Sequence, residues 1–527
     1  MADTDSNILI TSLRNPALYS GAVSAVELLE THISWVLLAG EFAYKLKKPV
    51  DLGFVDFTTL EKREHYCHEE LRLNRRFAPE LYLDVVPITG SPQAPVWGGE
   101  GTVIEYAVRM RRFPQEVLLS NVIAAGGLKE SHIDDLARRV AKFHAEVAVA
   151  DEQSPFGTAD AVLRPAEENF RRTQFPGRED ETRERLANLR NWTLAEHQRL
   201  YQTFAARKAN GFIRECHGDL HLGNMVLLDG RVTLFDCIEF NEHLRWIDVL
   251  SEVAFLVMDL ADRGRPDLGH RFLNAYLECT GDYAGLAIFR FYSTYRALVR
   301  AKVACLRAEQ GDLTAEEINR LYEEFRGYLA LAESSLQPPP AALILCSGVS
   351  GSGKSTGTQP LVERLPAIRI RSDVERKRLF GLAPEDRPDA ELTRELYSGD
   401  AGRRTYERMA ELARTVITAG HSVILDATFL QRAQRKQFGA LARELGVPFV
   451  ILEFEASPET LRARVQQRMA AGKDASDATL AVLDSQLAHR ELISPAEREA
   501  AIVVTVNEGE TLDVEMIARR IGGAASR

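Results

Sequence analysis

The sequence predicts two folds in succession: an α+β bilobal domain over residues 1–337, and an α/β domain with a five-stranded parallel sheet over residues 338–527. The division rests first on a helix-like segment, "TAEEINRLYEEFRGYLALAESSL", that runs into Pro338-Pro339-Pro340, which cannot continue a helix. Before the prolines, strand-like segments come first and charged helical segments follow. After them, short apolar runs alternate with helical segments, which is typical of a parallel sheet.

Size and composition indicate a globular protein of more than one domain. A chain of 527 residues is too long for one core, and 45% hydrophobic with 27% charged residues is an ordinary globular composition. The start, "MADTDSNILI", has no basic region before an apolar stretch, and runs such as "VAFLV" and "AALILC" are too short to cross a bilayer. The six cysteines lack metal-ligand or redox spacing. We therefore expect a cytoplasmic protein with reduced thiols and no membrane partner.

The net charge of −11 belongs to the first domain. Residues 341–527 hold 26 basic and 26 acidic residues, so residues 1–340 hold the remaining 39 of 65 basic and 50 of 76 acidic ones. An acidic surface disfavours non-specific nucleic-acid binding and weakly favours a cationic or neutral ligand. A charged, solvated surface that keeps the protein soluble explains the same count equally well.

Within the first domain we expect a small sheet-rich lobe over about residues 30–110 and a helical lobe over about 111–337. Residues 33–57 alternate as strands do, "LEKREHYCHEELRLNRRFAP" is typical of a charged helix, and "GTVIEYAVRMRRF" predicts another strand. Residues 1–30 receive no assignment.

Within the second domain, five apolar runs predict the strands of the parallel sheet: "ALILCS", "AIRIR", "SVILDA", "PFVILEFEA" and "AIVVTVN". The first run is followed by "GVSGSGKS", which matches G-x-x-x-x-G-K-S between a strand and a helix. Glycines there let backbone N–H groups surround a phosphate. We therefore expect ATP with Mg²⁺, Lys354 reaching the β/γ phosphates and Ser355 holding the metal. The predicted nucleotide-binding residues are Gly348, Ser350, Gly351, Ser352, Gly353, Lys354, Ser355 and Thr356.

Two carboxylates are further candidates for this site. Asp426 ends the strand-like "SVILDATF", where it could orient Mg²⁺, or could merely end the strand or cap a helix. Asp373 follows the run "AIRIR" and stands among Arg371, Arg376 and Lys377. It could accept the proton of an attacking hydroxyl while the basic residues hold an anion. The alternative for that segment is a helix N-cap at Ser372 with a solvated first turn.

A later helix carries two arginines on one face. Ser457 is a suitable N-cap before Pro458, and Arg464 and Arg468 are four residues apart. Such arginines can stabilise the transferring phosphoryl group as catalytic residues. Simple solvent exposure is the alternative.

Taken together, residues 341–527 resemble the small P-loop kinases, a group that includes gluconate kinase, zeta toxin and the kinase domain of polynucleotide kinase. The resemblance rests on "GVSGSGKS", on Asp373 with its arginines, on "LDATF" followed by Arg432 and Arg435, and on the arginine-bearing helix. It implies ATP-dependent phosphorylation of a hydroxyl group. No feature selects a sugar, a nucleotide-sugar or a nucleic-acid end as the acceptor.

A second, unrelated phosphoryl-transfer pattern lies in "ECHGDLHLGNMVLLDGRVTLFD". His217-Gly218-Asp219-Leu220 leads to Asn224 with the five-residue step from Asp to Asn that protein-kinase loops use. Asp229-Gly230 favours a two-residue hairpin, which would bring Asp236 back beside Asn224. A base and two metal ligands would then meet. The alternative is an ordinary polar turn with Asx caps, and we expect His221 to be a structural loop residue.

This loop resembles that of the aminoglycoside phosphotransferase and choline kinase group, which reads H-G-D-x-x-x-x-N, and the resemblance covers about residues 30–335. It implies a protein-kinase-like fold, with Asp219 as the base and with Asn224 and Asp236 holding Mg²⁺. An ATP-anchoring lysine and a glutamate are then expected upstream. Lys45 and Lys47 share one strand face; we favour Lys47, together with Glu70 over Glu69.

The first domain also departs from protein kinases. No G-x-G-x-x-G loop precedes the lysines, where Gly40 stands alone. Cys237 and Ile238 replace the last two residues of D-F-G, so regulation by an activation loop is not supported.

The sequence therefore predicts a bifunctional ATP-dependent phosphotransferase with two Mg–ATP sites that act on hydroxyl groups. Neither motif identifies the acceptor. Our interpretation takes small molecules as the acceptors. In the alternative, the first domain is a nucleotide-binding regulatory pseudokinase and only the P-loop domain catalyses. That domain could then act on a nucleic-acid 5′-hydroxyl or a nucleotide-sugar.

Overall fold

The computed structural model describes all residues except 1, 54, 310–312, 387, 472–477 and 526–527, and it forms two compact units. Unit 1 comprises Met1–Asp135, Glu146–Val162 and Phe204–Asp259, and unit 2 comprises Leu136–Ala145, Leu163–Thr203 and Leu260–Arg527. Unit 2 thus contains helices from before Pro338 as well as the chain after it. Residues of both units occur in α4 (Glu130–Glu146), α5 (Ala159–Arg172), α6 (Glu179–Ala209) and α8 (Val249–Asp262).

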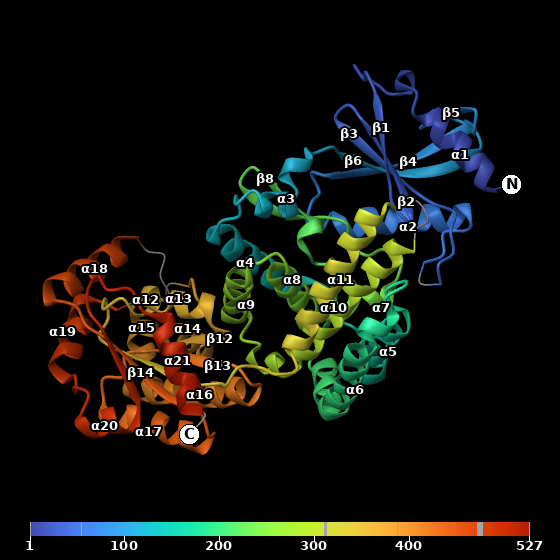
Figure 1. The fold of residues 1–527 in the computed structure, drawn as a ribbon. Helices are drawn as coiled ribbons and strands as arrows, with labels where there is room; N and C mark the ends of the chain where they lie inside the picture. The colour runs from blue at the N-terminus through green and yellow to red at the C-terminus, as the bar shows by residue number, and fades with distance from the viewer. Residues whose placement is uncertain (1, 54, 310–312, 387, 472–477, 526–527) are drawn as a thin grey trace. The chain divides into compact units, whose positions relative to one another are not determined.

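Unit 1 begins with a six-stranded antiparallel sheet in the order β1-β2-β3-β6-β4-β5 (Figure 1). Its strands are β1 (Val26–Glu30), β2 (Ser34–Ala39), β3 (Phe42–Lys47), β4 (Tyr82–Ser91), β5 (Ala94–Trp97) and β6 (Val103–Arg111). The previously unassigned start of the chain forms α1 (Ala2–Leu13) and β1. Leu9 and Leu13 of α1 pack in the same core as Leu37 and Tyr44 of the sheet.

Helix α2 (Leu60–Asn74) follows β3 and confirms the predicted charged helix. The hydroxyl of Thr59 caps it by accepting a hydrogen bond from the amide of Lys62. Cys67, Glu70 and Leu73 recur at a three-residue spacing and are all buried, so a helix of mostly charged residues presents one side to the core. That spacing carries the Glu70 carboxylate inward.

Unit 1 also contains several short elements. They are η1 (Pro16–Leu18), η2 (Gln115–Val117), α3 (Leu119–Ala124), β7 (Ile213–Glu215), η3 (Leu222–Asn224), β8 (Met225–Leu228), β9 (Arg231–Leu234), α7 (Glu242–Arg245) and β10 (Trp246–Asp248). Strands β8 and β9 form the predicted antiparallel hairpin. Asp229 and Gly230 have φ of 49° and 75°, the positive values that a two-residue type I′ turn requires.

Unit 2 contains a run of helices before the triple proline. They are α9 (Pro266–Thr280), η4 (Tyr283–Gly285), α10 (Leu286–Ala308) and α11 (Ala315–Ser334). Helix α11 confirms the helix predicted before Pro338. It starts with a capping box in which Thr314 and Glu317 each bond the other's backbone amide.

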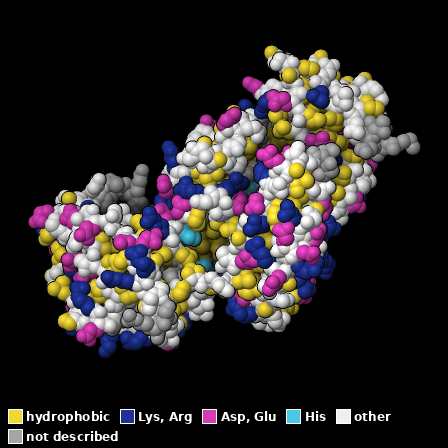
Figure 2. Space-filling view, viewed as in Figure 1, with side chains coloured by type: hydrophobic (Ala, Val, Ile, Leu, Met, Phe, Trp, Pro, Cys, Tyr) yellow, Lys and Arg dark blue, Asp and Glu magenta, His cyan; other side chains and the backbone are white. Residues whose placement is uncertain are grey.

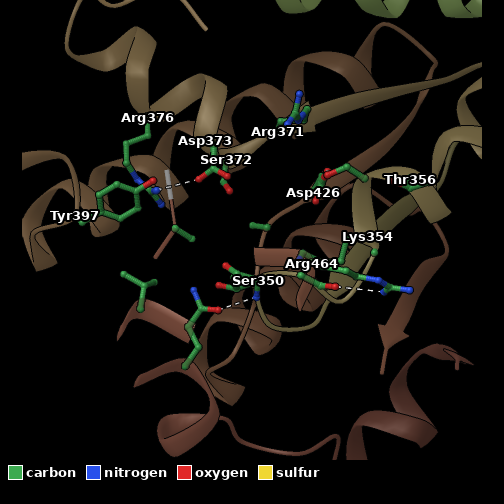
Figure 3. A pocket seen from close by; sticks show the side chains of 18 of the residues that line it. Ser350, Lys354, Thr356, Arg371, Ser372, Asp373, Arg376, Tyr397, Asp426 and Arg464 are labelled. Atoms are coloured by element: carbon green, nitrogen blue, oxygen red, sulfur yellow. Dashed lines mark hydrogen bonds and ion pairs between the residues drawn. The ribbon is translucent and has the colours of Figure 1, made fainter. Parts of the chain in front are cut away.

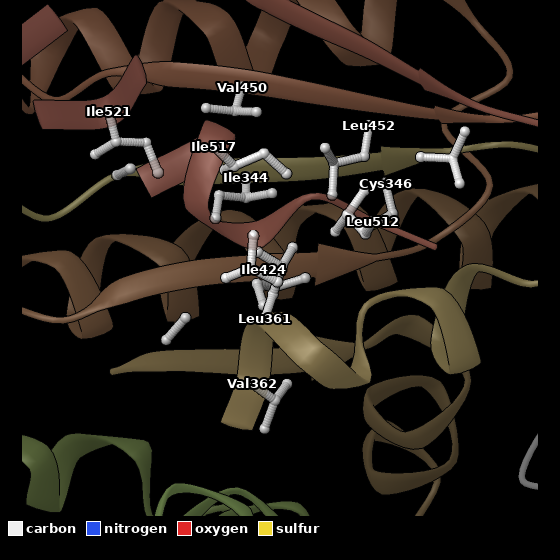
Figure 4. Close-up of a cluster of buried hydrophobic side chains, with 14 of the residues drawn as sticks. Ile344, Cys346, Leu361, Val362, Ile424, Val450, Leu452, Leu512, Ile517 and Ile521 are labelled. Carbon is white, nitrogen blue, oxygen red and sulfur yellow. The ribbon is translucent and has the colours of Figure 1, made fainter. Parts of the chain in front are cut away.

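The chain after the prolines folds into the predicted five-stranded, all-parallel sheet, in the order β12-β13-β11-β14-β15. Its strands are β11 (Leu343–Ser347), β12 (Ala367–Arg371), β13 (Ser422–Asp426), β14 (Phe449–Phe454) and β15 (Ile502–Val506). The three middle strands are apolar on both faces. Figure 4 shows Ile344, Ile424 and Val450 packed with Leu361 of α13 (Gln359–Arg364) and Ile517 of α21 (Val514–Ala525).

Helices cover this sheet and connect its strands (Figure 1). They are α12 (Lys354–Gly357), α13 (Gln359–Arg364), α14 (Ser372–Leu379), α15 (Ala390–Leu396), α16 (Gly399–Thr418), α17 (Arg432–Glu444), α18 (Pro458–Ala471), α19 (Leu480–His489), α20 (Pro495–Ala500) and α21 (Val514–Ala525). The first of them starts beyond the central strand β11. Loops after the carboxyl ends of parallel strands are where such sheets bind ligands.

Among the described residues, no helix is long and apolar enough to cross a membrane. On the face shown in Figure 2, basic and acidic side chains of the described residues are interspersed.

Candidate active sites

The loop from Gly348 to Ser355 has the backbone that a phosphate-binding loop needs. Gly348, Gly351 and Gly353 have φ of 154°, 85° and 93°, which residues with a Cβ rarely adopt. A Cβ would also lie only 2.8 Å from the carbonyl oxygen of Phe454 at Gly348, and 2.9 Å from that of Leu461 at Gly351. Gly348 and Gly351 are therefore required by both torsion and space, and Gly353 is required by torsion.

The charged and hydroxyl groups of this loop meet the end of β13. The Lys354 Nζ donates to the carbonyl oxygens of Gly348 and Val349, each at 2.9 Å. The Ser355 hydroxyl donates to Asp426 Oδ2 at 2.6 Å. Because β11 and β13 are parallel neighbours, their carboxyl ends meet and bring these two oxygen ligands together. Hard oxygen ligands of this kind suit Mg²⁺, so Ser355 and Asp426 fit the predicted metal.

A cavity of about 500 Å³ opens at the loop (Figure 3). Its lining residues are Ser350, Gly351, Gly353, Lys354, Ser355, Thr356, Arg371, Ser372, Asp373, Arg376, Tyr397, Tyr406, Asp426, Ala427, Thr428, Arg464, Gln467, Ala478, Val482 and Gln486. In Figure 3, Lys354, Thr356 and Arg464 lie on one side of this space and Asp373, Arg376 and Tyr397 on the other. Of the predicted loop residues, Gly348 and Ser352 do not line it.

Asp373 lies in the first turn of α14 and faces this cavity. Its Oδ1 accepts from Arg376 Nη1 at 3.1 Å, and the guanidinium of Arg376 lies 4.8 Å from the ring centroid of Tyr397. The N-cap of α14 is Arg371, without a side-chain capping bond, so the alternative of a cap at Ser372 is wrong. Ser372 is instead the first helical residue.

Helix α18 starts at Pro458 after Ser457, as predicted, and the Ser457 hydroxyl accepts from the amide of Thr460. Its Arg464 Nη1 donates to the Gly351 carbonyl at 3.3 Å and lines the cavity. The side chain of the other predicted arginine, Arg468, lies outside the described residues.

Arg435 does not reach the cavity. Its side chain is fully buried and donates to the backbone carbonyls of Phe429 and Glu491 and to the Glu497 carboxylate at 2.7 Å. Burial alone would raise the pKa of Glu497, but hydrogen bonds from Arg435 and Ser494 lower it to about 2. Arg435 therefore holds together the loops that follow β13 and α19.

Sequence reasoning missed Gln486 of α19. Its Oε1 accepts from the amide of Ser350 at 2.7 Å and so fixes the phosphate loop from a distance of 136 residues along the chain. No local pattern distinguishes this glutamine from a surface one.

In unit 1, the loop after His217 brings Asp219 and Asn224 together. Asn224 Nδ2 donates to Asp219 Oδ2 at 2.8 Å and to its carbonyl at 3.1 Å. The Phe235 amide donates to the Asn224 carbonyl at 3.0 Å, which places Asp236 next to the loop as the hairpin predicts. His221 Nδ1 accepts from the Gly223 amide, and its Nε2 lies 3.2 Å from Asp219 Oδ2.

Buried acids of α8, which sequence reasoning missed, hold this loop. Glu252 accepts from the amides of His217 and Gly218 at 3.2 and 2.7 Å, and Asp259 accepts from that of Leu222 at 2.8 Å. His217 is fully buried and donates from Nε2 to the Phe235 carbonyl at 2.9 Å; burial lowers its pKa. The spacing of seven residues between the two acids, which is two helical turns, is the only signal that could have linked them.

Asp236 has an unusual backbone for an aspartate, with φ of 63°. Its amide donates to the Tyr82 hydroxyl at 3.1 Å, and the next amide, that of Cys237, donates to Asn74 Oδ1 at 2.9 Å. These bonds hold the residue in the left-handed region, which is a conformation concentrated at functional sites.

Both predicted lysine candidates contact Glu70, but their surroundings differ. Lys45 Nζ lies 2.9 Å from Glu70 Oε1 and 2.5 Å from Asp236 Oδ1, with 13% of its side chain exposed. Lys47 Nζ lies 2.8 Å from Glu70 Oε2, also pairs with Glu239, and has no exposed surface. Glu69 turns away to bond Arg72. The structure therefore puts Lys45, rather than Lys47, beside the candidate metal ligand.

The charges of this cluster stabilise one another. Burial alone would raise the pKa of Glu70, but the ammonium groups of Lys45 and Lys47 lower it to about 2. Burial alone would lower the pKa of Lys45, but Asp236, Glu70 and Glu239 raise it well above its usual value. Both lysines and Glu70 are therefore charged at neutral pH.

Comparisons with known proteins agree with this arrangement. Residues 59–289 match the "Phosphotransferase enzyme family" and residues 343–493 match the "AAA domain" family. The chain is 32% identical over 465 residues to "Uncharacterized protein Rv2004c" of Mycobacterium tuberculosis strain H37Rv, covering 88% of this chain and 90% of that protein. "Uncharacterized protein Mb2027c" of Mycobacterium bovis matches with the same values.

The chain belongs to the family of these mycobacterial proteins. Its two kinase-like domains make it an ATP-dependent phosphotransferase.

Two solved structures are among those that match this chain. An ethanolamine kinase of Plasmodium vivax is 8% identical with a TM-score of 0.37, covering 64% of this chain and 94% of that one. Chaetomium thermophilum Kti12 in complex with ADP-AlF3 is 16% identical with a TM-score of 0.26, covering 34% of this chain and 95% of that one.

Proposed function

We propose that this phosphotransferase is bifunctional, with two separate Mg–ATP sites that each transfer a γ-phosphoryl group to a hydroxyl group of a small molecule. The proposal is supported by one feature: each unit brings together a lysine and several oxygen-bearing side chains that are suited to hold a metal and to accept a proton. In unit 1 these are Lys45, Asn224 with Asp236, and Asp219. In unit 2 the Ser355–Asp426 contact of 2.6 Å is the corresponding metal pair.

At the first site, Asp219 accepts the proton of the attacking hydroxyl, and Asn224 and Asp236 would hold Mg²⁺. We propose Lys45 as the lysine that anchors the ATP phosphates, with Glu70 holding it, because Lys45 contacts Asp236 and retains some exposure. Lys47 is fully buried between two carboxylates, which supports a structural role.

At the second site, the backbone from Gly348 to Ser355 surrounds the phosphates and Lys354 neutralises charge on the β and γ groups. Ser355 and Asp426 would hold Mg²⁺, which when bound would neutralise charge on the phosphates. Asp373 lies across the cavity from Lys354, where it can accept the proton of the acceptor hydroxyl (Figure 3). Arg464, at the loop's rim, adds positive charge.

A screen of ATP consumption with a library of hydroxyl-bearing metabolites tests the proposal. Wild type, Asp219→Ala and Lys354→Ala are compared. We expect some acceptors to be lost only in Asp219→Ala and others only in Lys354→Ala. Consumption that is unaffected by Asp219→Ala for every acceptor would instead support a regulatory first domain.

The same variants separate small-molecule from nucleic-acid acceptors. Labelling of 5′-hydroxyl oligonucleotides that depends on Lys354 and falls steeply with salt would contradict a small-molecule acceptor at the second site.

A further inference from the structure

Helix α9 packs along β12, an edge strand of the parallel sheet in unit 2, and polar side chains form the contact. His270 Nδ1 donates to the Glu363 carbonyl at 2.9 Å, and Arg271 Nη1 pairs with the Glu363 carboxylate at 2.7 Å. Asn274 Nδ2 donates to the Ala367 carbonyl at 3.0 Å, and its Oδ1 accepts from the Arg369 amide at 2.7 Å. Residues 270, 274 and 278 are four apart and so share one face of α9.

This contact leads directly to the phosphate site. Strand β12, which Asn274 holds, ends at Arg371, and Asp373 follows two residues later. Within the same strand, Arg369 Nη1 donates to the carbonyl of Ser355 at 2.9 Å. The position of β12 therefore fixes the side of the cavity opposite the phosphate loop.

The last contact of α9 orients a cavity residue. Arg371 Nη1 lies 3.0 Å from Glu278 Oε1, with 17% and 23% of the two side chains exposed. Arg371 lines the cavity, whereas Glu278 does not. Glu278 therefore holds the guanidinium from outside the cavity.

A second guanidinium lines the same side. Arg376 is 15% exposed, is oriented by Asp373 and Tyr397, and its Nε is buried without a hydrogen-bond partner among the described residues. Two partly desolvated arginines beside the candidate base form a site suited to an anion, because a guanidinium offers several donors to one carboxylate or phosphate.

We propose that the acceptor at the P-loop site carries an anionic group, a phosphate or a carboxylate, which Arg371 and Arg376 bind, and that Glu278 of α9 positions Arg371 for it. This inference rests on the proposed function, because it assigns the far side of the cavity to the acceptor. Glu278 lies within residues 59–289, so a residue of the phosphotransferase-family match takes part in forming the second site.

The test uses adenosine 5′-tetraphosphate, whose fourth phosphoryl group extends past the γ position towards the acceptor side. Binding of this probe and of ATP, each with Mg²⁺, is measured by calorimetry on the full chain carrying Asp236→Ala to weaken the first site. We expect one strong site that is lost on adding Lys354→Ala. At that site the tetraphosphate should bind about tenfold more tightly than ATP, as one or two charge-assisted hydrogen bonds would give.

Arginine variants show whether this preference arises where we place it. Arg371→Gln or Arg376→Gln should reduce the preference to about twofold or less and leave ATP affinity nearly unchanged. Arg403→Gln is the matched control, because Arg403 is an exposed arginine paired with Asp400 and Glu407 and lies outside the cavity lining. It should keep the preference, which excludes a general effect of net charge.

Two variants of Glu278 test whether it positions Arg371, again through the preference for the tetraphosphate over ATP. Glu278→Ala should lose most of the preference, whereas Glu278→Gln, which keeps an acceptor oxygen for Arg371, should retain it.

Equal affinity for both nucleotides in the chain with Arg371 and Arg376 intact, or a preference that survives Arg371→Gln, would overturn the proposal. Displacement of the tetraphosphate by a 5′-hydroxyl oligonucleotide would support an anionic group on the acceptor but reject the small-molecule acceptor of the proposed function. Absence of any ATP binding that depends on Lys354 would instead reject the proposed function itself.

Discussion

Lys45 and Lys47 share one strand face but differ in how deeply their side chains are buried. Alternation along β3 predicts that both point the same way, and both do contact Glu70. Alternation contains no information on which lysine lies nearer the nucleotide. That difference depends on Asp236, 191 residues from Lys45, and on Glu239, 192 residues from Lys47. The preference for Lys47 from the sequence could not take these distant partners into account.

The first prediction concerns these lysines. Lys47→Met leaves Glu70 and Glu239 without their shared cation in the interior and should lower the free energy of unfolding by about 3–5 kcal/mol. Lys45→Met should cost less stability, because the side chain keeps 13% exposure, yet abolish the ATP consumption that depends on Asp219. Urea unfolding and ATP consumption of both variants check this. Equal stability losses would contradict the difference in role.

The second prediction concerns pH and Glu497. Its pKa is lowered to about 2 in the fold, against 4.5 in the unfolded chain. The unfolded chain therefore binds the proton first, and the stability that this carboxylate contributes is present above about pH 4.5 and lost as the pH falls towards 2. The contribution is about 1 kcal/mol after allowance for solvent screening.

Glu497→Gln should remove this part of the pH dependence. Unfolding midpoints measured between pH 5 and pH 2.5 should fall less steeply in the variant than in wild type. Glu444→Gln is a suitable control, since its partner Arg414 forms an exposed ion pair. An unchanged slope in Glu497→Gln would contradict the assignment.

At the scale of elements, the sequence pattern predicted those strands and turns that are determined by residues close together in the chain. The five strands of the parallel sheet were predictable because each is a continuous buried run, and the β8–β9 hairpin because Asp229-Gly230 suits its turn. Strands β4 and β5 were not predicted, since β4 contains Pro87 and is only partly buried through its middle. Prolines are uncommon inside sheets.

The residues of the candidate sites likewise divide into those that the sequence could predict and those that it could not. Residues close together in the sequence, such as Asp219 with Asn224, could be predicted as a group. Residues that hold the sites from afar could not: Gln486 and Glu252 are an ordinary glutamine and an ordinary glutamate on helices, and only tertiary packing gives them their partners. The packing of α9 against β12 has no local signal either.

The third prediction tests that packing at the level of the element. Asn274→Ala removes two hydrogen bonds to β12 and leaves a buried carbonyl and amide without a partner, which should cost about 1–3 kcal/mol. Hydrogen exchange of the Arg369 amide should become faster than in wild type. Asn507→Ala, which removes an exposed asparagine that bonds Glu510, is the control. Unchanged exchange at Arg369 would show that α9 does not hold this strand.

At the scale of the whole molecule, the packing unit that contains the P-loop part starts well before the triple proline. Unit 2 includes α9, α10 and α11 as well as the sheet, and Arg290 of α10 also donates to the carbonyls of Ala419 and Gly420. A cut at Pro338 therefore passes through a packed unit.

The fourth prediction follows from this. A fragment of residues 338–527 should unfold at a temperature at least about 5 °C below that of the same region in the full chain, because it lacks the polar contacts of α9 and α10. Differential scanning calorimetry of the fragment and the full chain measures the difference. A fragment with an unchanged transition would mean that those contacts contribute little.

The Asn274 side chain has one more consequence. Strand β12 is the outermost strand at its end of the sheet, and the carbonyl of Ala367 and the amide of Arg369 point away from β13, where a strand of another molecule could add. The amide group of Asn274 occupies both positions as a short piece of backbone would. Helix α9 thereby protects the sheet from intermolecular strand addition, so loss of α9 would expose a surface for aggregation.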